Sequence, residues 1–236
     1  MKPVAHKLHK NSLITLAGTV GVGKSSLTKA LSNALGFAPS FEKVEGNPYL
    51  EDYYHDFKAW SFHLQIYFLA ERFKQQKQMF ESNLGYVQDR SIYEDVGIFA
   101  KMQYEKGNMT ERDYDTYRSL FEAMIISPYF PKPDVLIFID GEFSSIMKRI
   151  HDRGREMELT TSKQYWLDLY NRYHEWILTF KECPILHLDI DAYDCSNHAS
   201  IERIVRAIEE IQANKDLRYL KLDKNYLHEN KVFLNG

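Results

Sequence analysis

The feature that most constrains the fold is the stretch GTVGVGKSS at residues 18–26, between an apolar run at 13–17 and a helical-period segment from residue 24. Its spacing is G-x-x-x-x-G-K-[ST], the signature of a phosphate-binding loop. Glycines let the backbone approach phosphate oxygens closely, and the following helix directs its positive end at the same anions. The motif predicts a strand–loop–helix unit that binds ATP through Gly18, Thr19, Val20, Gly21, Val22, Gly23, Lys24, Ser25 and Ser26.

Two side chains of this loop have chemical roles of their own. We expect Lys24 to reach the outer phosphates and the Ser25 hydroxyl to bind Mg²⁺. The alternative is a glycine-rich turn without a ligand, which the preceding strand and the following helix disfavour. The motif does not identify the phosphoryl acceptor, so water, a protein and a small molecule all remain open.

The rest of the chain alternates short apolar runs with longer segments of helical period. This pattern predicts an α/β fold with about five mostly parallel strands flanked by helices. We expect one domain over residues 1–213, followed by a charged, aperiodic tail at 214–236. Strands are predicted at 13–18, 86–90, 134–140 and 184–190, with a weaker one ending near Phe41, and helices at 24–35, 58–82, 91–106, 110–127, 143–152, 162–181 and 200–213.

Composition excludes several functional classes. Hydrophobic residues make up 44% of the 236 residues, enough for a sizeable core, and a net charge of −3 argues against nucleic-acid binding. The sequence has no apolar run long enough for a membrane span and no signal-peptide core. Cys183 and Cys195 lack metal-ligand spacing. We therefore expect a cytoplasmic protein without a structural metal.

Glu42 is a candidate for acid–base chemistry. It follows the weak strand that ends near Phe41, and neighbouring strands of a parallel sheet end at one crevice, so its carboxylate would face the phosphate loop. Transfer of a phosphoryl group to an alcohol needs a group that takes the hydroxyl proton. Taken alone, Glu42 fits an exposed acidic residue on a loop better than a catalytic base.

Three arginines fall within the segment KRIHDRGREME at 148–158. Guanidinium groups this close repel one another unless anions are near, and their geometry suits phosphate oxygens. We expect Arg149, Arg153 and Arg155 to form a lid, at about 149–161, that closes over the donor phosphates. The alternative is a solvated surface run balanced by neighbouring acids.

The motifs YHDFKAWSFHLQIYFLAER (54–72), QDRSIYEDVGIFAK (88–101) and KRIHDRGREME (148–158), with the phosphate loop and EKVEGNPYL (42–50), resemble the deoxyribonucleoside kinase family. The similarity is strongest to bacterial members that phosphorylate deoxyadenosine and deoxycytidine. It implies a P-loop kinase fold and ATP- and Mg²⁺-dependent phosphorylation of a deoxynucleoside 5′-hydroxyl in nucleoside salvage. It also implies feedback inhibition by a deoxynucleoside triphosphate and a homodimer packed through long helices.

The resemblance also implies roles for individual residues. Glu42 corresponds to the general base, and Arg90 to the residue that holds the 5′-oxygen and donor phosphate; Lys24 completes the predicted catalytic set. Asp89 stands where some members have a glutamate that helps hold Mg²⁺, and its shorter side chain would reach the metal through water. Tyr54 and Glu158 resemble the pair that binds the sugar 3′-hydroxyl. The base-binding candidates are Gln65, Arg72, Asp95 and Phe99.

The base preference follows only weakly from the residues. A glutamine amide presents an acceptor beside a donor, which complements adenine and cytosine, but a flipped amide would read guanine or thymine. An ionised Asp95 only accepts hydrogen bonds and so favours an exocyclic amino group. Mainly because of the resemblance, deoxyadenosine and deoxycytidine are the preferred substrates, and deoxyguanosine stays open.

Three other functions compete with this prediction. VLIFIDGE at 135–142 has the apolar-run-then-acid form of an ATPase motif, in which Asp140 would serve Mg²⁺ and Glu142 water. A non-catalytic nucleotide-binding module is disfavoured by the intact Lys24, Glu42 and Arg90. A nucleoside monophosphate kinase would need basic residues for an acceptor phosphate, where EKVEGNPYLEDYY (42–54) supplies acids.

Overall fold

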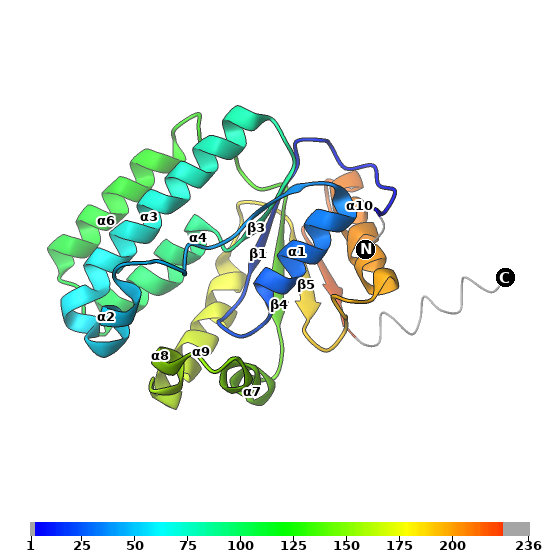
Figure 1. Cartoon of the computed structure of the whole chain (residues 1–236). Coiled ribbons are helices and arrows are strands. Elements are labelled where there is room, and N and C mark those ends of the chain that lie inside the picture. Colours follow the sequence, from blue (N-terminus) through cyan, green and yellow to red (C-terminus); the bar gives the residue numbers. More distant parts are fainter. Residues whose placement is uncertain (1–2, 224–236) are drawn as a thin grey trace.

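The fold is built on one parallel sheet of six strands in the order β2-β3-β1-β4-β5-β6, shown in Figure 1. A computed structural model describes residues 3–223. The strands are β1 (Leu13–Ala17), β2 (Ala38–Ser40), β3 (Tyr86–Asp89), β4 (Val135–Asp140), β5 (Ile185–Asp189) and β6 (Tyr219–Leu222).

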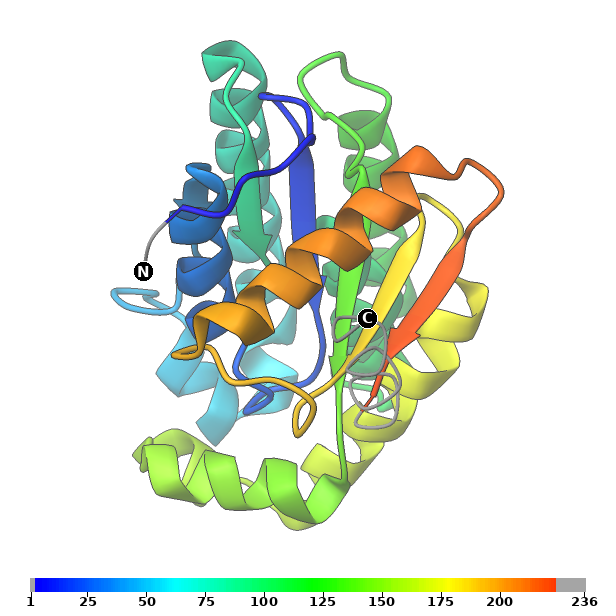
Figure 2. The same ribbon diagram turned by 90° about the vertical axis from the view of Figure 1, so that its right-hand side faces the viewer.

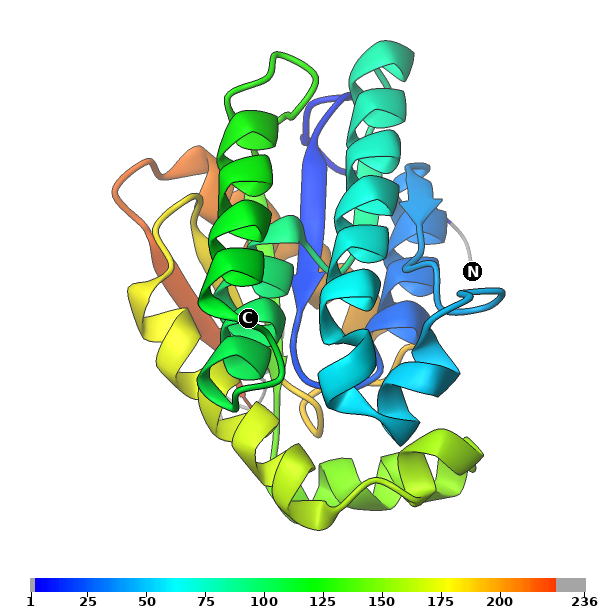
Figure 3. The same cartoon turned by 90° about the vertical axis from the view of Figure 1, so that its left-hand side faces the viewer.

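Long helices cover both faces of the sheet. In Figure 2, α1 (Lys24–Leu35) and α10 (His198–Ala213) lie on one face. In Figure 3, α3 (Phe57–Ser82), α6 (Glu111–Ile125) and α9 (Lys163–Thr179) lie on the other. Strands covered on both faces need near-continuous apolar runs. Accordingly, Ile14, Leu16 and Ile137 of the central strands are fully buried.

Shorter elements complete the chain. The segment after β3 combines α4 (Ile92–Glu94), a π-helical turn η1 (Asp95–Ala100) and α5 (Lys101–Glu105). Such π-helical turns occur frequently at functional sites. The others are α2 (Leu50–His55), α7 (Phe143–Arg153) and α8 (Glu156–Leu159).

The α/β fold with a parallel sheet is confirmed, with one strand more than expected. The predicted tail at 214–236 differs from the structure in its first part, because Tyr219–Leu222 pair with β5 as a sixth strand. A run of four alternating residues in a charged segment is too short to show a period. The strand forms because Leu222 is buried against the core. The remainder of that predicted tail, 224–236, lies outside the described residues. Helices α2 and α8 were also not predicted, since each spans fewer than two turns.

Parallel pairing brings the carboxyl ends of β1, β3 and β4 to one edge of the sheet. The loop to α1, the turn at Arg90 and the segment leading to α7 all start there. Residues far apart in sequence therefore meet at this edge. Over residues 3–223, no helix is both long enough and apolar enough to cross a membrane.

Candidate active site

The loop between β1 and α1 has the geometry expected of a phosphate-binding loop. Gly21 has a φ of 89°, and a Cβ there would lie 2.7 Å from Ile150 Cγ1 of α7. Lys24 points back into the loop, where its Nζ donates to the carbonyls of Gly18 (2.8 Å) and Thr19 (3.0 Å). Burial, together with the nearby Arg90 charge, lowers the pKa of Lys24 to about 8. A bound phosphate group would add negative charge beside this ammonium, which already lies near Asp89, Glu94 and Glu42.

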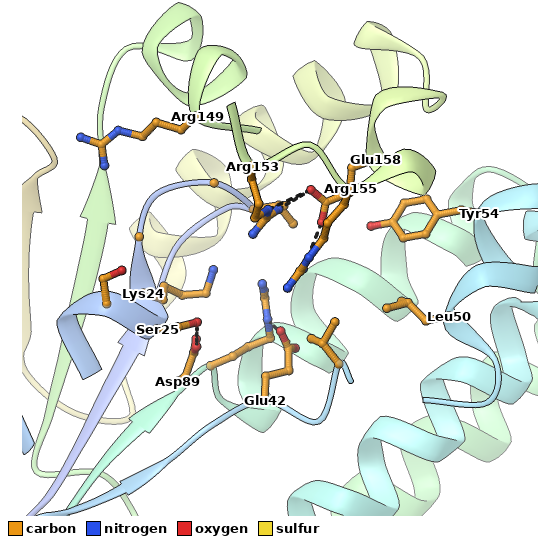
Figure 4. A pocket seen from close by; sticks show the side chains of 16 residues that line it. Lys24, Ser25, Glu42, Leu50, Tyr54, Asp89, Arg149, Arg153, Arg155 and Glu158 are labelled. Carbon is orange, nitrogen blue, oxygen red and sulfur yellow. Dashed lines mark hydrogen bonds and ion pairs between the residues drawn. The ribbon is translucent and has the colours of Figure 1, made fainter. Parts of the chain in front are cut away.

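Ser25 and Asp89 meet at the start of α1. The Ser25 hydroxyl donates to Asp89 Oδ2 at 2.5 Å (Figure 4). The other carboxylate oxygen, Asp89 Oδ1, is buried without a hydrogen-bond partner among the described residues. Oxygen donors beside a phosphate site suit Mg²⁺, which commonly binds one or two carboxylates and completes its shell with phosphate and water. The residues present thus fit the expected ion.

Glu42 lies between two arginine side chains. Its Oε1 is 2.7 Å from Arg90 Nε and 3.2 Å from Arg72 Nη2. Burial by itself would raise the pKa of Glu42, but Arg90, Arg72 and Lys24 outweigh it and hold the pKa below its ordinary value. The carboxylate is therefore ionised at neutral pH and can accept a proton or a hydrogen bond.

Arg90 is held in a backbone conformation unusual for its type. Its φ is 69°, in the left-handed region that costs an L-residue roughly 1–2 kcal/mol. The guanidinium lies 4.7 Å from the centre of the Phe99 ring and forms an ion pair with Glu94 at 3.3 Å. Residues strained in this way cluster at active sites.

Glu94 is a site residue that the sequence analysis missed. Its carboxylate, fully buried, accepts hydrogen bonds from the Ser91 backbone N–H (2.8 Å), the Tyr173 hydroxyl (2.8 Å) and the Gly18 N–H (3.4 Å). One carboxylate thus joins the phosphate loop, the end of β3 and α9. The available signal was the spacing of Ser91 and Glu94, which form a capping box.

Two connected pockets open at this edge of the sheet, which we call the phosphate pocket and the inner pocket. Leu50 and several of the predicted residues line both pockets, so the pockets join there. The predicted residues Val20, Glu42, Tyr54 and Arg90 line both; Gly21, Gly23, Lys24, Ser25, Ser26, Asp89, Arg149, Arg153, Arg155 and Glu158 line the phosphate pocket; Gln65, Asp95 and Phe99 line the inner pocket.

Gly18, Thr19, Val22 and Arg72 line neither pocket. Arg72 instead lies outside both pockets and contacts residues that line them. It donates hydrogen bonds to Glu42 and, at 3.1 Å, to Asp95 Oδ2. Gly18, Thr19 and Val22 belong to the backbone of the phosphate loop.

The inner pocket carries polar groups in a mainly apolar wall. Gln65 is buried, and its Oε1 has no hydrogen-bond partner among the described residues. Burial raises the pKa of Asp95 to about 6, although Arg72 opposes the change. An orphaned buried acceptor costs free energy unless a ligand satisfies it. Gln65 and Asp95 are therefore suited to read polar atoms of a bound molecule.

The predicted lid is formed by the end of α7 and by α8. Arg153 Nε and Arg155 Nη1 donate to the Glu158 carboxylate at 3.1 and 3.2 Å. Arg149 points away from this pair (Figure 4), and its guanidinium is 3.5 Å from the Ile190 carbonyl. The three arginines thus approach the phosphate pocket from two sides.

The structure disfavours the ATPase interpretation of VLIFIDGE. Asp140 lines neither pocket. Its carboxylate instead contacts His174 Nε2 at 2.9 Å and His187 Nε2 at 3.4 Å, and these partners hold its pKa well below the ordinary range against the effect of burial. The two histidines account for Asp140 without a metal or a water.

A phosphate pocket joined to a second pocket with its own polar groups defines a P-loop kinase that acts on a small molecule. The deoxynucleoside kinase family model matches residues 14–213. The chain belongs to this family and is a phosphotransferase.

Individual relatives agree with the family match. The chain is 60% identical to the deoxyadenosine/deoxycytidine kinase of Bacillus subtilis, over 87% of this chain and 95% of that protein. It is 37% identical to a deoxyguanosine kinase of Lactobacillus acidophilus, over 82% and 87% of the two chains. A structure of deoxyadenosine kinase from M. mycoides with bound dATP superposes with a TM-score of 0.71 at 34% identity, covering 83% of this chain and 98% of that one.

Proposed function

We propose that this kinase phosphorylates the 5′-hydroxyl of deoxyadenosine and deoxycytidine, with ATP as donor and Mg²⁺ as cofactor. The observation that carries the base preference is the buried, unpaired Gln65 Oε1 in the same pocket as Asp95. Adenine and cytosine each present an exocyclic amino group beside a ring-nitrogen acceptor, and these two side chains complement that pattern. The name of the Bacillus subtilis relative, which includes both nucleosides, supports the same choice.

In the proposed reaction Glu42 takes the 5′-hydroxyl proton. Arg90, 2.7 Å from that carboxylate, orients it and holds the 5′-oxygen beside the donor phosphate. Lys24 and the lid arginines neutralise negative charge on the transferred group. Mg²⁺ held by Ser25 and Asp89 would supply further charge neutralisation at the phosphates.

We further propose that Tyr54 and Glu158 hold the sugar 3′-hydroxyl. Because Glu158 also accepts hydrogen bonds from Arg153 and Arg155, nucleoside binding and lid position would be linked through one carboxylate. The sugar contact would then favour lid closure only over an occupied acceptor site, which limits phosphoryl transfer to water.

Feedback inhibition by a deoxynucleoside triphosphate belongs to the same proposal. The two pockets are connected, so one molecule can place its base in the inner pocket and its phosphates in the phosphate pocket. The M. mycoides enzyme has been solved with dATP and with dCTP. We also propose that the protein is a cytoplasmic homodimer.

The deciding experiment measures ADP release with ATP·Mg²⁺ and each deoxynucleoside in turn, with adenosine and cytidine, and without an acceptor. Turnover confined to deoxyadenosine and deoxycytidine is expected, and dATP should compete with ATP in the same assay. A preference for deoxyguanosine would keep the mechanism and overturn the assignment of Gln65 and Asp95. Equal ADP release without an acceptor would overturn the proposed function.

A further inference from the structure

Tyr173 of α9 contacts Arg90 but lines neither pocket, and the proposed reaction gives it no role. It is 1% exposed, and its ring stacks on Phe138 of β4 with the ring centres 6.4 Å apart. Its hydroxyl forms hydrogen bonds with Arg90 Nη1 and, at 2.8 Å, with Glu94 Oε1. Arg90 Nη1 is itself 3.3 Å from Glu94 Oε1. These three side chains form a closed set of contacts, which we call the Arg90 triangle.

The chemistry of the groups fixes the direction of the hydrogen bonds in this triangle. A guanidinium has donors and no acceptor, so Arg90 donates to the phenol oxygen and to the carboxylate. Burial raises the pKa of Tyr173 well above its ordinary value, although Arg90 opposes the change, so the phenol keeps its proton. Because Arg90 cannot accept that proton, Tyr173 donates it to Glu94.

Glu94 is held in place by backbone donors as well. The Ser91 N–H donates to its Oε2 at 2.8 Å, and the Ser91 hydroxyl lies 3.2 Å from the same oxygen. The Gly18 N–H donates to Oε1 at 3.4 Å. The position of the carboxylate is therefore tied to the phosphate loop and to the end of β3, and Tyr173 adds a contact from α9.

The triangle decides which nitrogen of Arg90 is available to a ligand. Nη1 contacts Glu94 and Tyr173, and Nε faces Glu42 at 2.7 Å. Within residues 3–223, no hydrogen bond engages the remaining nitrogen, Nη2, although Arg90 lines both pockets. A guanidinium is planar, so holding Nη1 and Nε also fixes the position of Nη2.

We propose that Tyr173 and Glu94 are positioning residues for phosphoryl transfer, which hold Arg90 Nη1 so that Nη2 is presented to the donor phosphate. The inference rests on the proposed function, in which Arg90 holds the 5′-oxygen beside that phosphate. A contact that orients a group for the transition state acts on kcat. Nucleoside binding through Gln65 and Asp95 does not involve the triangle, so KM for the nucleoside should be spared.

Tyr173→Phe removes the hydroxyl and keeps the ring that stacks on Phe138. With saturating ATP·Mg²⁺ and deoxyadenosine, kcat should fall about ten- to a hundredfold, the value of a hydrogen bond to a charged group. KM for deoxyadenosine should change by less than about threefold. A loss that appears in this KM and leaves kcat unchanged would overturn the inference.

Tyr170→Phe is the matched control on the same helix. The Tyr170 hydroxyl donates to the Gly141 carbonyl at 3.1 Å, and Tyr170 lines neither pocket. This variant also loses one tyrosine hydrogen bond of α9, but it leaves the Arg90 triangle intact, so its kcat should match the wild-type value. Equal losses of kcat in the two variants would show that any such bond in α9 is needed, and would overturn the specific role of Tyr173.

A double-mutant cycle with Arg90→Met separates positioning from a structural role. Methionine leaves no guanidinium for the triangle to orient, and the residual kcat is measured at raised enzyme concentration. In this background, Tyr173→Phe should lower kcat by less than about twofold, because both changes remove the same effect. A tyrosine that merely stabilises the fold would cost the same factor in both backgrounds, which would overturn the positioning role.

Glu94→Gln tests the other member of the triangle. The surrounding groups all donate to this carboxylate, so the new amide nitrogen would face a donor. Its kcat should fall while KM for deoxyadenosine is kept, and the combination with Tyr173→Phe should lose less than the product of the two single losses. A Glu94→Gln variant with wild-type kcat would remove Glu94 from the proposal.

The remaining outcomes separate this inference from the proposed function. If Glu94→Gln does not fold, Tyr173→Phe alone and in the Arg90→Met background still decides whether the triangle acts through Arg90. A Tyr173→Phe variant with wild-type kcat overturns the inference even when deoxyadenosine is a good substrate. Failure of the wild-type enzyme to phosphorylate deoxyadenosine at all would overturn the proposed function itself.

Discussion

Asp95 and Glu42 contact the same arginine, yet their pKa values move in opposite directions. Asp95 is buried and Glu42 is half-buried. Glu42 has close contacts with Arg72 and Arg90, whereas within residues 3–223 Asp95 forms an ion pair with Arg72 only. Burial therefore prevails at Asp95, whose pKa rises to about 6, and the arginine charges prevail at Glu42. The pKa of the proposed base-reading carboxylate therefore lies closer to neutral pH than that of the proposed catalytic base.

This difference predicts the acid limb of the pH profile. As the pH falls from 7.5 to 5, Asp95 takes up a proton near pH 6 and loses its charge, so kcat/KM for deoxyadenosine should fall with an apparent pKa of about 6. Initial rates at subsaturating nucleoside measure it. The Glu42 limb should lie below the ordinary carboxylate range.

Asp95→Asn is the control for this assignment, since it should lower activity and remove the limb near pH 6. Unfolding through Asp95 would not mimic the effect. A carboxyl whose folded-state pKa is raised makes the folded state more stable as the pH falls through this window. A limb near pH 6 that persists in Asp95→Asn would contradict the assignment.

At the scale of elements, the phosphate loop and α7 are packed too closely for a side chain at residue 21. A Cβ at Gly21 would meet Ile150 Cγ1 at 2.7 Å and the Ile146 carbonyl oxygen at 3.1 Å. Because α7 carries Arg149 and Arg153 of the predicted lid, this contact fixes the position of these arginines relative to the loop. The loop and the lid are thus one packed unit rather than two independent motifs.

Gly21→Ala should therefore cost more than an ordinary loop substitution. Left-handed strain and overpacking together are expected to lower the free energy of unfolding by about 2–5 kcal/mol and to raise KM for ATP. Gly36→Ala is the matched control, with a φ of 67° and nothing within 4 Å of the added Cβ, so strain alone should cost about 1–2 kcal/mol there. Urea unfolding and ATP saturation curves measure both. Equal effects at the two positions would refute the packing argument.

At the scale of the whole molecule, α3 and α6 form an outer layer beside each other (Figure 3). Apolar side chains remain exposed on and beside these helices: Phe80 (48%), Leu120 (41%), Ile126 (83%) and Tyr129 (42%). Exposed apolar surface of this kind is commonly covered by a partner. The proposed homodimer would use this surface.

Sedimentation velocity should find twice the chain mass for the wild-type protein. Ile126→Lys, at the end of α6, should shift the protein toward monomer because it places a charge in the proposed interface. Leu178→Lys is a matched control, since Leu178 is also 83% exposed but lies on α9. A monomeric wild-type protein, or equal dissociation by both variants, would contradict the proposed surface.

The sequence by itself determined the phosphate loop, four of the strands with close bounds, the long helices and most of the residues that line the two pockets. These features depend on neighbouring residues: a glycine loop needs particular backbone angles at consecutive positions, and buried strands and helices need apolar residues at a local period. Family motifs included Glu42, Gln65 and Asp95 among the predicted site residues, and all three line a pocket in the structure. The motifs did not reveal the partners of these side chains.

Only the tertiary structure decided which charges pair and which distant side chains form hydrogen bonds. Glu42 meets Arg72 and Arg90 from across the sheet edge, Glu94 joins the loop to α9, and Gln103 reaches Tyr53 from a helix fifty residues away. The sixth strand likewise exists because β5 offers an edge for it. Such contacts depend on packing between distant segments, which no local pattern of residue types specifies.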